Sequence, residues 1–207
     1  MIKVVQPRNF GWLEKKLSDQ EMDYLWKCID NKKKDWKENL VGNISSSYEL
    51  MDRGDWFFNN TVIPLIKIYE KEFVDPASNI PFKGKHPFYL NSWWVNYQKQ
   101  TEFNPAHDHN GVYSFVVWMK IPTSYQQQKN LPIATKSASK AISNFEFSFL
   151  NLLGYTMSWT YRMSPEWEGT MLFFPGKLRH QVYPFYDCDD ERISISGNIL
   201  LNTYKNL

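Results

Sequence analysis

Two histidines separated by a single residue lie in the segment NPAHDHNG, residues 104–111. If this segment is extended, His107 and His109 point to the same side, about 6.6 Å apart along the chain, while Asp108 points the other way. Imidazole nitrogens with that spacing can converge on a metal ion at about 2.1 Å each. The pair alone is equally compatible with two polar loop residues, so a metal site depends on a further ligand.

A third candidate ligand is His180, which follows a Pro-Gly turn at the end of an apolar segment, GTMLFFPGKLRH. In a jelly roll, a distant strand of this kind can bring its side chain against the first pair. Three of the four histidines thus occur in two settings that suit one metal site. We therefore predict His107, His109 and His180 as metal ligands, with Asp108 as an alternative ligand if the backbone departs from regular extension.

A polar strand face is predicted near the C-terminus, in the segment RISISGN. Its even-numbered residues, 192–198, are Arg, Ser, Ser and Asn, whereas isoleucines alternate with them. Such a row is a poor core face and a good pocket wall. Arg192 with Ser194 two residues later can hold a carboxylate through charge-assisted hydrogen bonds. The alternative is an edge strand whose polar face is solvated.

The elements that must position these residues change in type along the chain. Ser18 and Glu21 form a capping box at the start of a predicted helix. A second helix is expected within 55–73, where Pro64 either kinks it or lies near its start. From residue 87 onward, about seven short alternating segments bounded by Gly, Pro, Asn or Asp predict an antiparallel sandwich or barrel.

Two segments of this second part have distinct patterns. In YTMSWTYR, residues 155–162, the aromatic residues and Met157 alternate with Thr and Ser, as in a strand with one apolar face. Residues 123–143 are polar, with three lysines and no acidic residue. We predict a long mobile loop there and a candidate lid over the site, because loops of that length are often functional.

Composition limits the classes of protein. The 207 residues suffice for one domain, and an aromatic share of 17% favours sheet. A net charge of +2 is too small to indicate nucleic-acid or membrane binding. Cys28 and Cys188 form no disulfide framework, and the N-terminus lacks the apolar run of a signal peptide. A cytoplasmic protein without a membrane segment is expected.

Three blocks together resemble the Fe(II)- and 2-oxoglutarate-dependent oxygenases, in particular those encoded by bacteriophages and above all cyanophages. They are WWVNYQKQTEFNPAHDHNGVYSFVVWMKIP, EGTMLFFPGKLRHQVYPFY and ERISISGNI. The likeness covers most of residues 88–200, and residues 38–75 match more loosely. It implies a mainly β fold, the double-stranded β-helix or distorted jelly roll, with N-terminal helices packed on one side. It also implies a single oxygenase domain over 1–207, mostly helical in 1–86 and with the jelly-roll core in 87–207.

The resemblance also implies roles for individual residues. His107 matches the first iron-binding histidine and His180 the distal one. Arg192 and Ser194 match the pair that binds the far carboxylate of 2-oxoglutarate. Tyr97, ten residues before His107, matches a tyrosine that often helps to hold this co-substrate.

The chain departs from the family pattern at the third ligand. Most members have His-x-Asp or His-x-Glu and so bind iron with two histidines and one carboxylate. Here the third position is His109. A site of three histidines carries one negative charge less, so the resemblance alone does not establish how this site binds iron.

The function expected from these features is that of a dioxygenase that uses Fe(II), 2-oxoglutarate and O2. It would hydroxylate a substrate of unspecified class (a peptidyl or free amino acid, a nucleobase or a small metabolite) and release succinate and CO2. If the chain is phage-encoded, its compartment is the host cytoplasm. The sequence does not specify an oligomeric state.

Two other functions are compatible with the histidine pattern. One is a three-histidine iron dioxygenase of the cupin type, which does not use 2-oxoglutarate. Cupins, however, have a glutamate about four residues after the second histidine, where this chain has Tyr113, and they give no role to Arg192 and Ser194. The other is a jelly-roll binding protein without catalytic activity.

Overall fold

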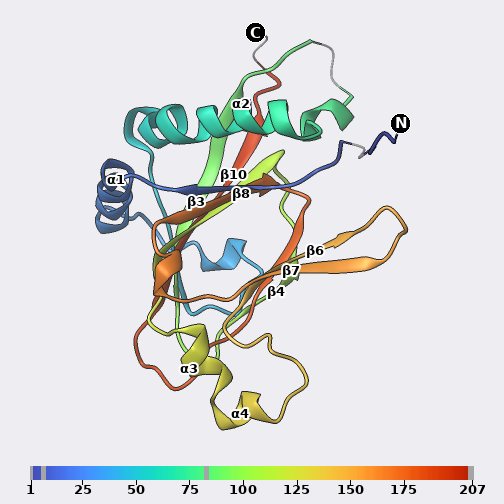
Figure 1. Ribbon diagram of the computed structural model, residues 1–207. Helices are drawn as coiled ribbons and strands as arrows, with labels where there is room; N and C mark the ends of the chain where they lie inside the picture. The colour runs from blue at the N-terminus through green and yellow to red at the C-terminus, as the bar shows by residue number, and fades with distance from the viewer. Residues whose placement is uncertain (1, 6–7, 82–83, 205–207) are drawn as a thin grey trace.

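Two antiparallel sheets stack against each other in the computed structural model, which describes residues 2–5, 8–81 and 84–204 (Figure 1). The larger sheet has the strand order β1-β8-β5-β10-β3-β2 and the smaller one β4-β9-β6-β7. This is the jelly roll predicted from the sequence. The strands are β1 Leu13–Lys16, β2 Ser46–Glu49, β3 Phe88–Gln98, β4 Asn104–His107, β5 Tyr113–Lys120, β6 Phe145–Leu150, β7 Thr156–Tyr161, β8 Thr170–Pro175, β9 Arg179–Val182 and β10 Arg192–Leu201.

Two helices cover the outer face of the larger sheet, α1 Asp19–Asp30 and α2 Ile63–Glu72 (Figure 1). The capping box predicted for α1 is present, with Ser18 as the N-cap and Glu21 bonded back to it. A π-helical turn, Phe58–Val62, precedes α2. Pro64 lies in the first turn of α2, which follows the π-helical turn without a break in helical backbone. The helical segment therefore begins before the proline, which lies where the π-helical turn changes to α-helix.

Glu21 also connects α1 to β1 and to the π-helical turn. Although this side chain is buried, its carboxylate accepts hydrogen bonds from Lys15, from Thr61 Oγ1 at 2.6 Å and from Ser18. Desolvation raises the pKa of Glu21, but these hydrogen bonds outweigh it and hold the pKa at about 2. The charged form of Glu21 is thus part of the folded state.

Strand alternation divides the core into two parts. On β5, Phe115 and Val117 pack toward the helices, whereas Val116 and Trp118 face the space between the two sheets. The second group is joined by aromatic residues of β6 and β8, among them Phe147 and Phe174. The candidate site lies at one end of this inter-sheet space.

The part expected to be mostly helical, 1–86, also supplies β1 and β2, the two edge strands of the larger sheet. The expected long loop needs a correction. Residues 123–143 are not a plain loop but carry α3 Tyr125–Lys129 and α4 Pro132–Thr135. Ser124 caps α3 through a capping box with Gln127, which supplies the N-terminal hydrogen bonds that such a short helix needs. Within the described part of the chain, no helix is long and apolar enough to cross a membrane.

Candidate metal and co-substrate site

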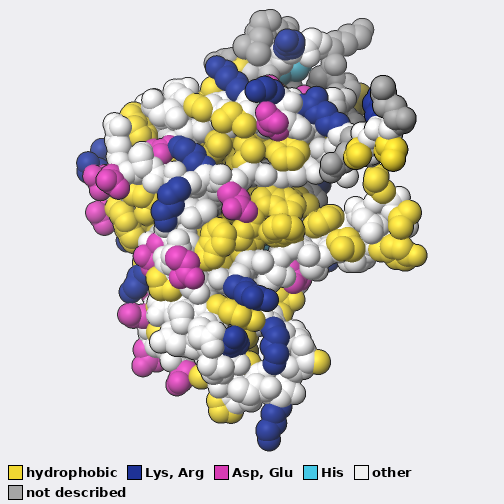
Figure 2. Space-filling model, viewed as in Figure 1, with side chains coloured by type: hydrophobic (Ala, Val, Ile, Leu, Met, Phe, Trp, Pro, Cys, Tyr) yellow, Lys and Arg dark blue, Asp and Glu magenta, His cyan; other side chains and the backbone are white. Residues whose placement is uncertain are grey.

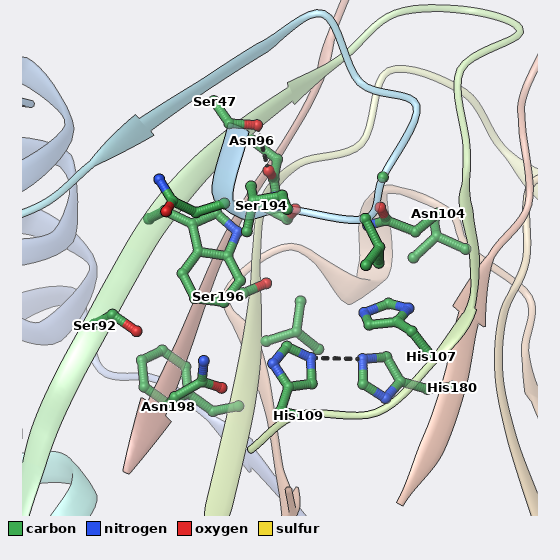
Figure 3. A pocket seen from close by; sticks show the side chains of 18 of the residues that line it. Ser47, Ser92, Asn96, Asn104, His107, His109, His180, Ser194, Ser196 and Asn198 are labelled. Carbon is green, nitrogen blue, oxygen red and sulfur yellow. Dashed lines mark hydrogen bonds between the residues drawn. The ribbon is translucent and has the colours of Figure 1, made fainter. Parts of the chain in front are cut away.

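Three histidines converge between β4, β9 and the turn after β4 (Figure 3). His107 lies directly opposite His180 in the antiparallel pairing of β4 with β9, and their ring centroids are 4.3 Å apart. His109 faces the same point, with its Nε2 3.2 Å from His180 Nε2. The candidate ligand atoms of all three residues lie within 4.8 Å of one another, which is close enough for one ion to contact each.

His109 reaches this position although β4 ends at His107. Its backbone N–H donates to Gly176 O at 2.8 Å, and Gly176 N–H donates to Val112 O at 2.9 Å. A Cβ atom on Gly176 would lie 2.2 Å from Gly111 O, so only glycine allows this close approach. The turn after β4 and the Pro-Gly turn after β8 therefore hold each other and bring His109 beside His180.

The hydrogen bonds of the imidazoles determine which nitrogens carry protons. His107 Nδ1 lies 2.7 Å from Pro105 O, and His180 Nδ1 lies 2.9 Å from Leu178 O. Because a carbonyl oxygen can only accept, each Nδ1 must donate, which leaves the Nε2 of these neutral rings without a proton. The contact between the Nε2 atoms of His109 and His180 is then favourable only with a proton or a cation between them. Asn198 forms a hydrogen bond with His109 that raises the pKa of His109, as expected if Asn198 accepts the bond from the imidazole.

Burial keeps these imidazoles uncharged. Desolvation lowers the pKa of His107, and it lowers the pKa of His109 to about 4 with a further contribution from His107. The pKa of His180 lies well below its ordinary value because of burial and the two neighbouring histidines. Phe174 and Phe145 pack around the His180 ring at centroid distances of 5.0 and 5.7 Å. At neutral pH the site offers three unprotonated imidazoles, the form that binds metals.

Asp108 does not join the three histidines. Its carboxylate forms an ion pair with Lys177 at 2.8 Å, on the exposed side of the turn. Among the described residues, the group of histidine, cysteine and acidic side chains placed to hold a metal is His107, His109 and His180 alone. The geometry therefore favours His109 over Asp108 as the third ligand. Tyr113, at the position where cupins have a glutamate, packs in the other core against Tyr69 and Phe173.

Arg192, the first residue of β10, is a buried cation without a counterion. Its side chain is 1% exposed, and burial lowers its pKa to about 9. It donates to Ser143 O at 3.0 Å, to Ser143 Oγ and to Gln98 Oε1 at 3.4 Å. No acidic side chain of the described residues pairs with it, and its Nε has no hydrogen-bond partner among them. Since buried charges are normally paired, this environment suits the binding of an anionic ligand.

The polar face of β10 forms a wall of a cavity of about 360 Å³ that also contains the histidines (Figure 3). Ser194, Ser196 and Asn198 line it, as the alternation predicted. The opposite, odd-numbered face buries Ile195 and Ile199 in the core under the helices. Arg192 lies behind this lining and touches it through Gln98.

Tyr97 does not lie in this cavity. Its ring packs against Tyr48, with centroids 6.0 Å apart, on the face of β3 that is turned away from the histidines. Its neighbours Asn96 and Gln98 line the cavity instead. These two amides were not among the predicted site residues, because the distance of Tyr97 from His107 along the chain does not determine which face of β3 lies inside. The strand period offered the signal, since Trp94, Asn96 and Gln98 share one face.

A family model described as "Putative 2OG-Fe(II) oxygenase" matches residues 92–198, just over half of the chain. The chain belongs to the 2OG-Fe(II) oxygenases. The match spans the histidines, the Arg192 strand and the segment between them. Family membership makes Fe(II) and 2-oxoglutarate the metal and co-substrate that the site must accommodate.

One solved structure supports this fold, and two others are similar at lower scores. An oxidoreductase of the 2OG-Fe(II) oxygenase family from Burkholderia pseudomallei superposes with a TM-score of 0.54 at 9% identity, over 92% of this chain and 84% of the other. A Pseudomonas putida prolyl-4-hydroxylase gives a TM-score of 0.47 at 14% identity, over 92% of both chains. HygX from Streptomyces hygroscopicus, solved with nickel, 2-oxoglutarate and hygromycin B, gives 0.48 at 8% identity, over 94% and 84%. A comparison with curated protein sequences found no match.

The residues of the site are suited to hold both Fe(II) and 2-oxoglutarate. Three neutral imidazoles on one side of an ion suit Fe(II), which accepts imidazole ligands readily. The site nonetheless departs from the usual family pattern, because an imidazole replaces the carboxylate. With a divalent ion bound, the centre of three neutral imidazoles would carry a charge of +2, of which the carboxylate at the near end of 2-oxoglutarate would neutralise one unit. The orphaned cation Arg192 offers a partner for the far end of 2-oxoglutarate.

Proposed function

We propose that the protein is an Fe(II)- and 2-oxoglutarate-dependent hydroxylase. His107, His109 and His180 hold the iron, and Arg192 with Ser194 binds the far carboxylate of 2-oxoglutarate. The observation that carries this proposal is that one strand, β10, links the two halves of the site. Arg192 begins the strand, and Asn198 on the same face is hydrogen-bonded to His109.

The chain's own groups prepare the site in separate ways. Pro105 O and Leu178 O fix the tautomers of His107 and His180, so that each presents Nε2. Asn198, which accepts a hydrogen bond from Ser114 Oγ at 3.2 Å, orients the His109 ring. Phe145 and Phe174 keep water from the inner side of the histidines.

The co-substrate is oriented from the wall of the cavity where β10 and β3 pair. Ser194 and Ser196 provide hydroxyl groups from β10, and the amide of Asn96 provides a donor from β3. When bound, Fe(II) with O2 supplies the oxidising power that converts 2-oxoglutarate to succinate and CO2 and hydroxylates the substrate. The substrate binds in the remaining part of the same cavity, beside the histidines. On the sequence likeness alone, we also propose that the chain is of the bacteriophage-encoded kind.

The test is a titration of metal-free protein with Fe(II) and then 2-oxoglutarate under anaerobic conditions. Chelation of the co-substrate should produce a visible metal-to-ligand charge-transfer band, and exposure to O2 should then yield succinate. If iron binds but neither band nor succinate forms, the cupin alternative is favoured. If iron does not bind at stoichiometric levels, the protein is a non-catalytic jelly-roll binding protein.

A further inference from the structure

The β6–β7 hairpin projects from the body of the molecule (Figure 1). β6 pairs with β9 only from Phe145 to Ser148, so the outer half of the hairpin has no neighbouring strand on that side. β7 is the last strand of the smaller sheet and pairs with β6 alone. Its outer edge therefore presents unpaired backbone N–H and C=O groups.

The outer part of this hairpin, residues 150–159, exposes an unusual amount of apolar surface. The exposed fractions are 65% for Leu150, 76% for Leu152, 78% for Leu153, 65% for Tyr155, 44% for Met157 and 52% for Trp159. Figure 2 shows these apolar side chains extending beyond the body of the molecule. Large apolar and aromatic side chains bury about 150–250 Å² each, so these fractions add to roughly 600 Å² per chain. Patches of that size on one protein usually mark an interface.

The apolar face of the hairpin continues outward from the core. At its base, Trp12 packs on Phe147 and Trp159 at centroid distances of 4.8 and 5.7 Å. Farther out, Phe149 pairs with Met157 on the same face, where Met157 remains 44% exposed. The opposite face pairs Ser148 with Ser158 and Leu150 with Thr156, so it is polar except for Leu150 at the tip. The hairpin is thus amphipathic, and the described residues cover only the inner part of its apolar face.

Charge distinguishes between the occupants that such a surface could take. Residues 147–161, FSFLNLLGYTMSWTY, contain no acidic or basic residue. Natural edge strands are commonly protected by lysine or proline, and β7 has neither. Amphipathic elements that lie on a lipid surface usually carry lysine and arginine on their polar face, and residues 147–161 carry none. When identical strands pair antiparallel across a twofold axis, a charged residue near the axis meets its own copy or another like charge, which is unfavourable. A neutral strand avoids this cost.

We propose that the hairpin is a self-association surface, on which β7 pairs antiparallel with β7 of a second copy of this chain. The pairing joins two four-stranded sheets into one and satisfies the edge backbone groups of both copies. Where the apolar side chains of the two hairpins also cover each other, up to roughly 1,200 Å² is buried, the lower end of the range for specific interfaces. The proposal is independent of the metal site, because none of these residues holds a ligand.

The experiment is sedimentation velocity of the full chain between 1 and 100 µM, with the variants Met157→Lys and Tyr155→Lys. Each places two like charges, one from each copy, near the twofold axis. The control is Ile133→Lys on α4, which adds the same charge at an apolar position that is 61% exposed. The parent and the control should form dimers in this range. Both hairpin variants should dissociate at least tenfold more readily with unchanged thermal unfolding.

A parent protein that stays monomeric at 100 µM would overturn the proposal. So would hairpin variants that dimerise as the parent does. Cosedimentation with phosphatidylcholine vesicles is measured in parallel. If the monomeric parent binds these vesicles and Met157→Lys does not, the hairpin is a lipid-binding element and self-association is refuted.

Discussion

Replacing Arg192 with methionine tests two effects of the buried charge separately. One is its cost to the stability of the ligand-free protein, and the other is its contribution to the binding of 2-oxoglutarate. Burial lowers the pKa of Arg192 from 12.5 to about 9. That difference corresponds to about 5 kcal/mol of lost hydration in the ligand-free protein. Methionine fills similar space without a charge, although it leaves Ser143 O without its donor, at a cost of about 1–3 kcal/mol. We therefore expect the ligand-free variant to be at least as stable as the parent.

With 2-oxoglutarate bound, the parent should be more stable than the variant. Breaking a buried ion pair by removing one partner costs about 3–5 kcal/mol, so the affinity for 2-oxoglutarate should fall by more than a hundredfold. At 100 times its Kd, 2-oxoglutarate stabilises the parent by about 2.7 kcal/mol, which raises Tm by about 5–10 °C. The variant should show almost no rise at the same concentration.

The assay is thermal unfolding of Fe(II)-loaded protein, kept anaerobic, with increasing 2-oxoglutarate. The matched control is Arg162→Met, because Arg162 is an exposed arginine whose guanidinium stacks on Tyr125 outside the cavity. It should respond to the co-substrate as the parent does. If Arg192→Met retains a Kd within threefold of the parent, Arg192 does not bind the carboxylate and the assignment is refuted.

Three further predictions concern the metal site and the N-terminal helix. His180→Ala should abolish stoichiometric Fe(II) binding in metal analysis after dialysis, whereas His109→Asp, which restores a carboxylate, should retain it; loss in both variants would mean that His109 acts specifically as an imidazole. Gly176→Ala should weaken Fe(II) binding at least tenfold and lower the unfolding free energy by about 2 kcal/mol, since the new methyl group overlaps the facing backbone. The folded-state pKa of Glu21 is depressed to about 2, so its stabilisation is complete above about pH 4.5 and is lost as the pH falls toward 2. Glu21→Gln should therefore lower the unfolding free energy at pH 7 by up to about 3 kcal/mol and much less near pH 2, and an equal loss at both pH values in urea titrations would contradict this account.

Strand alternation was the most reliable guide from the sequence. The period of two along β10 correctly placed Ser194, Ser196 and Asn198 in the cavity. The same rule applied to β3 predicts Asn96 and Gln98 in the cavity. Tyr97, which the family resemblance implied, lies on the other face of the strand. A residue counted along a strand lands on the wrong face whenever the count is off by one.

Other features depended on contacts that sequence patterns do not contain. His109 is placed by the close approach of Gly176 to Gly111, residues 65 positions apart in the chain. The helices in 123–143 are short, and polar composition obscured the capping box at Ser124. Trp159 has the alternation of a core strand, but it is 52% exposed because the hairpin extends past the sheet. Periodicity indicates which side of a strand is apolar and does not indicate what covers it.

Ser143 has a backbone φ of +63°, a conformation that residues other than glycine rarely adopt. From this position its carbonyl and hydroxyl oxygens both accept from the Arg192 guanidinium, much as the two oxygens of a carboxylate would. Under the proposed assignment, Ser143 is already hydrogen-bonded to the Arg192 guanidinium before 2-oxoglutarate binds. Binding is then an exchange, in which an anion replaces two uncharged oxygens and releases the end of the segment that carries α3 and α4. The measured affinity for 2-oxoglutarate would include the free energy of that release, so substitutions at position 143 would tune it without touching the iron.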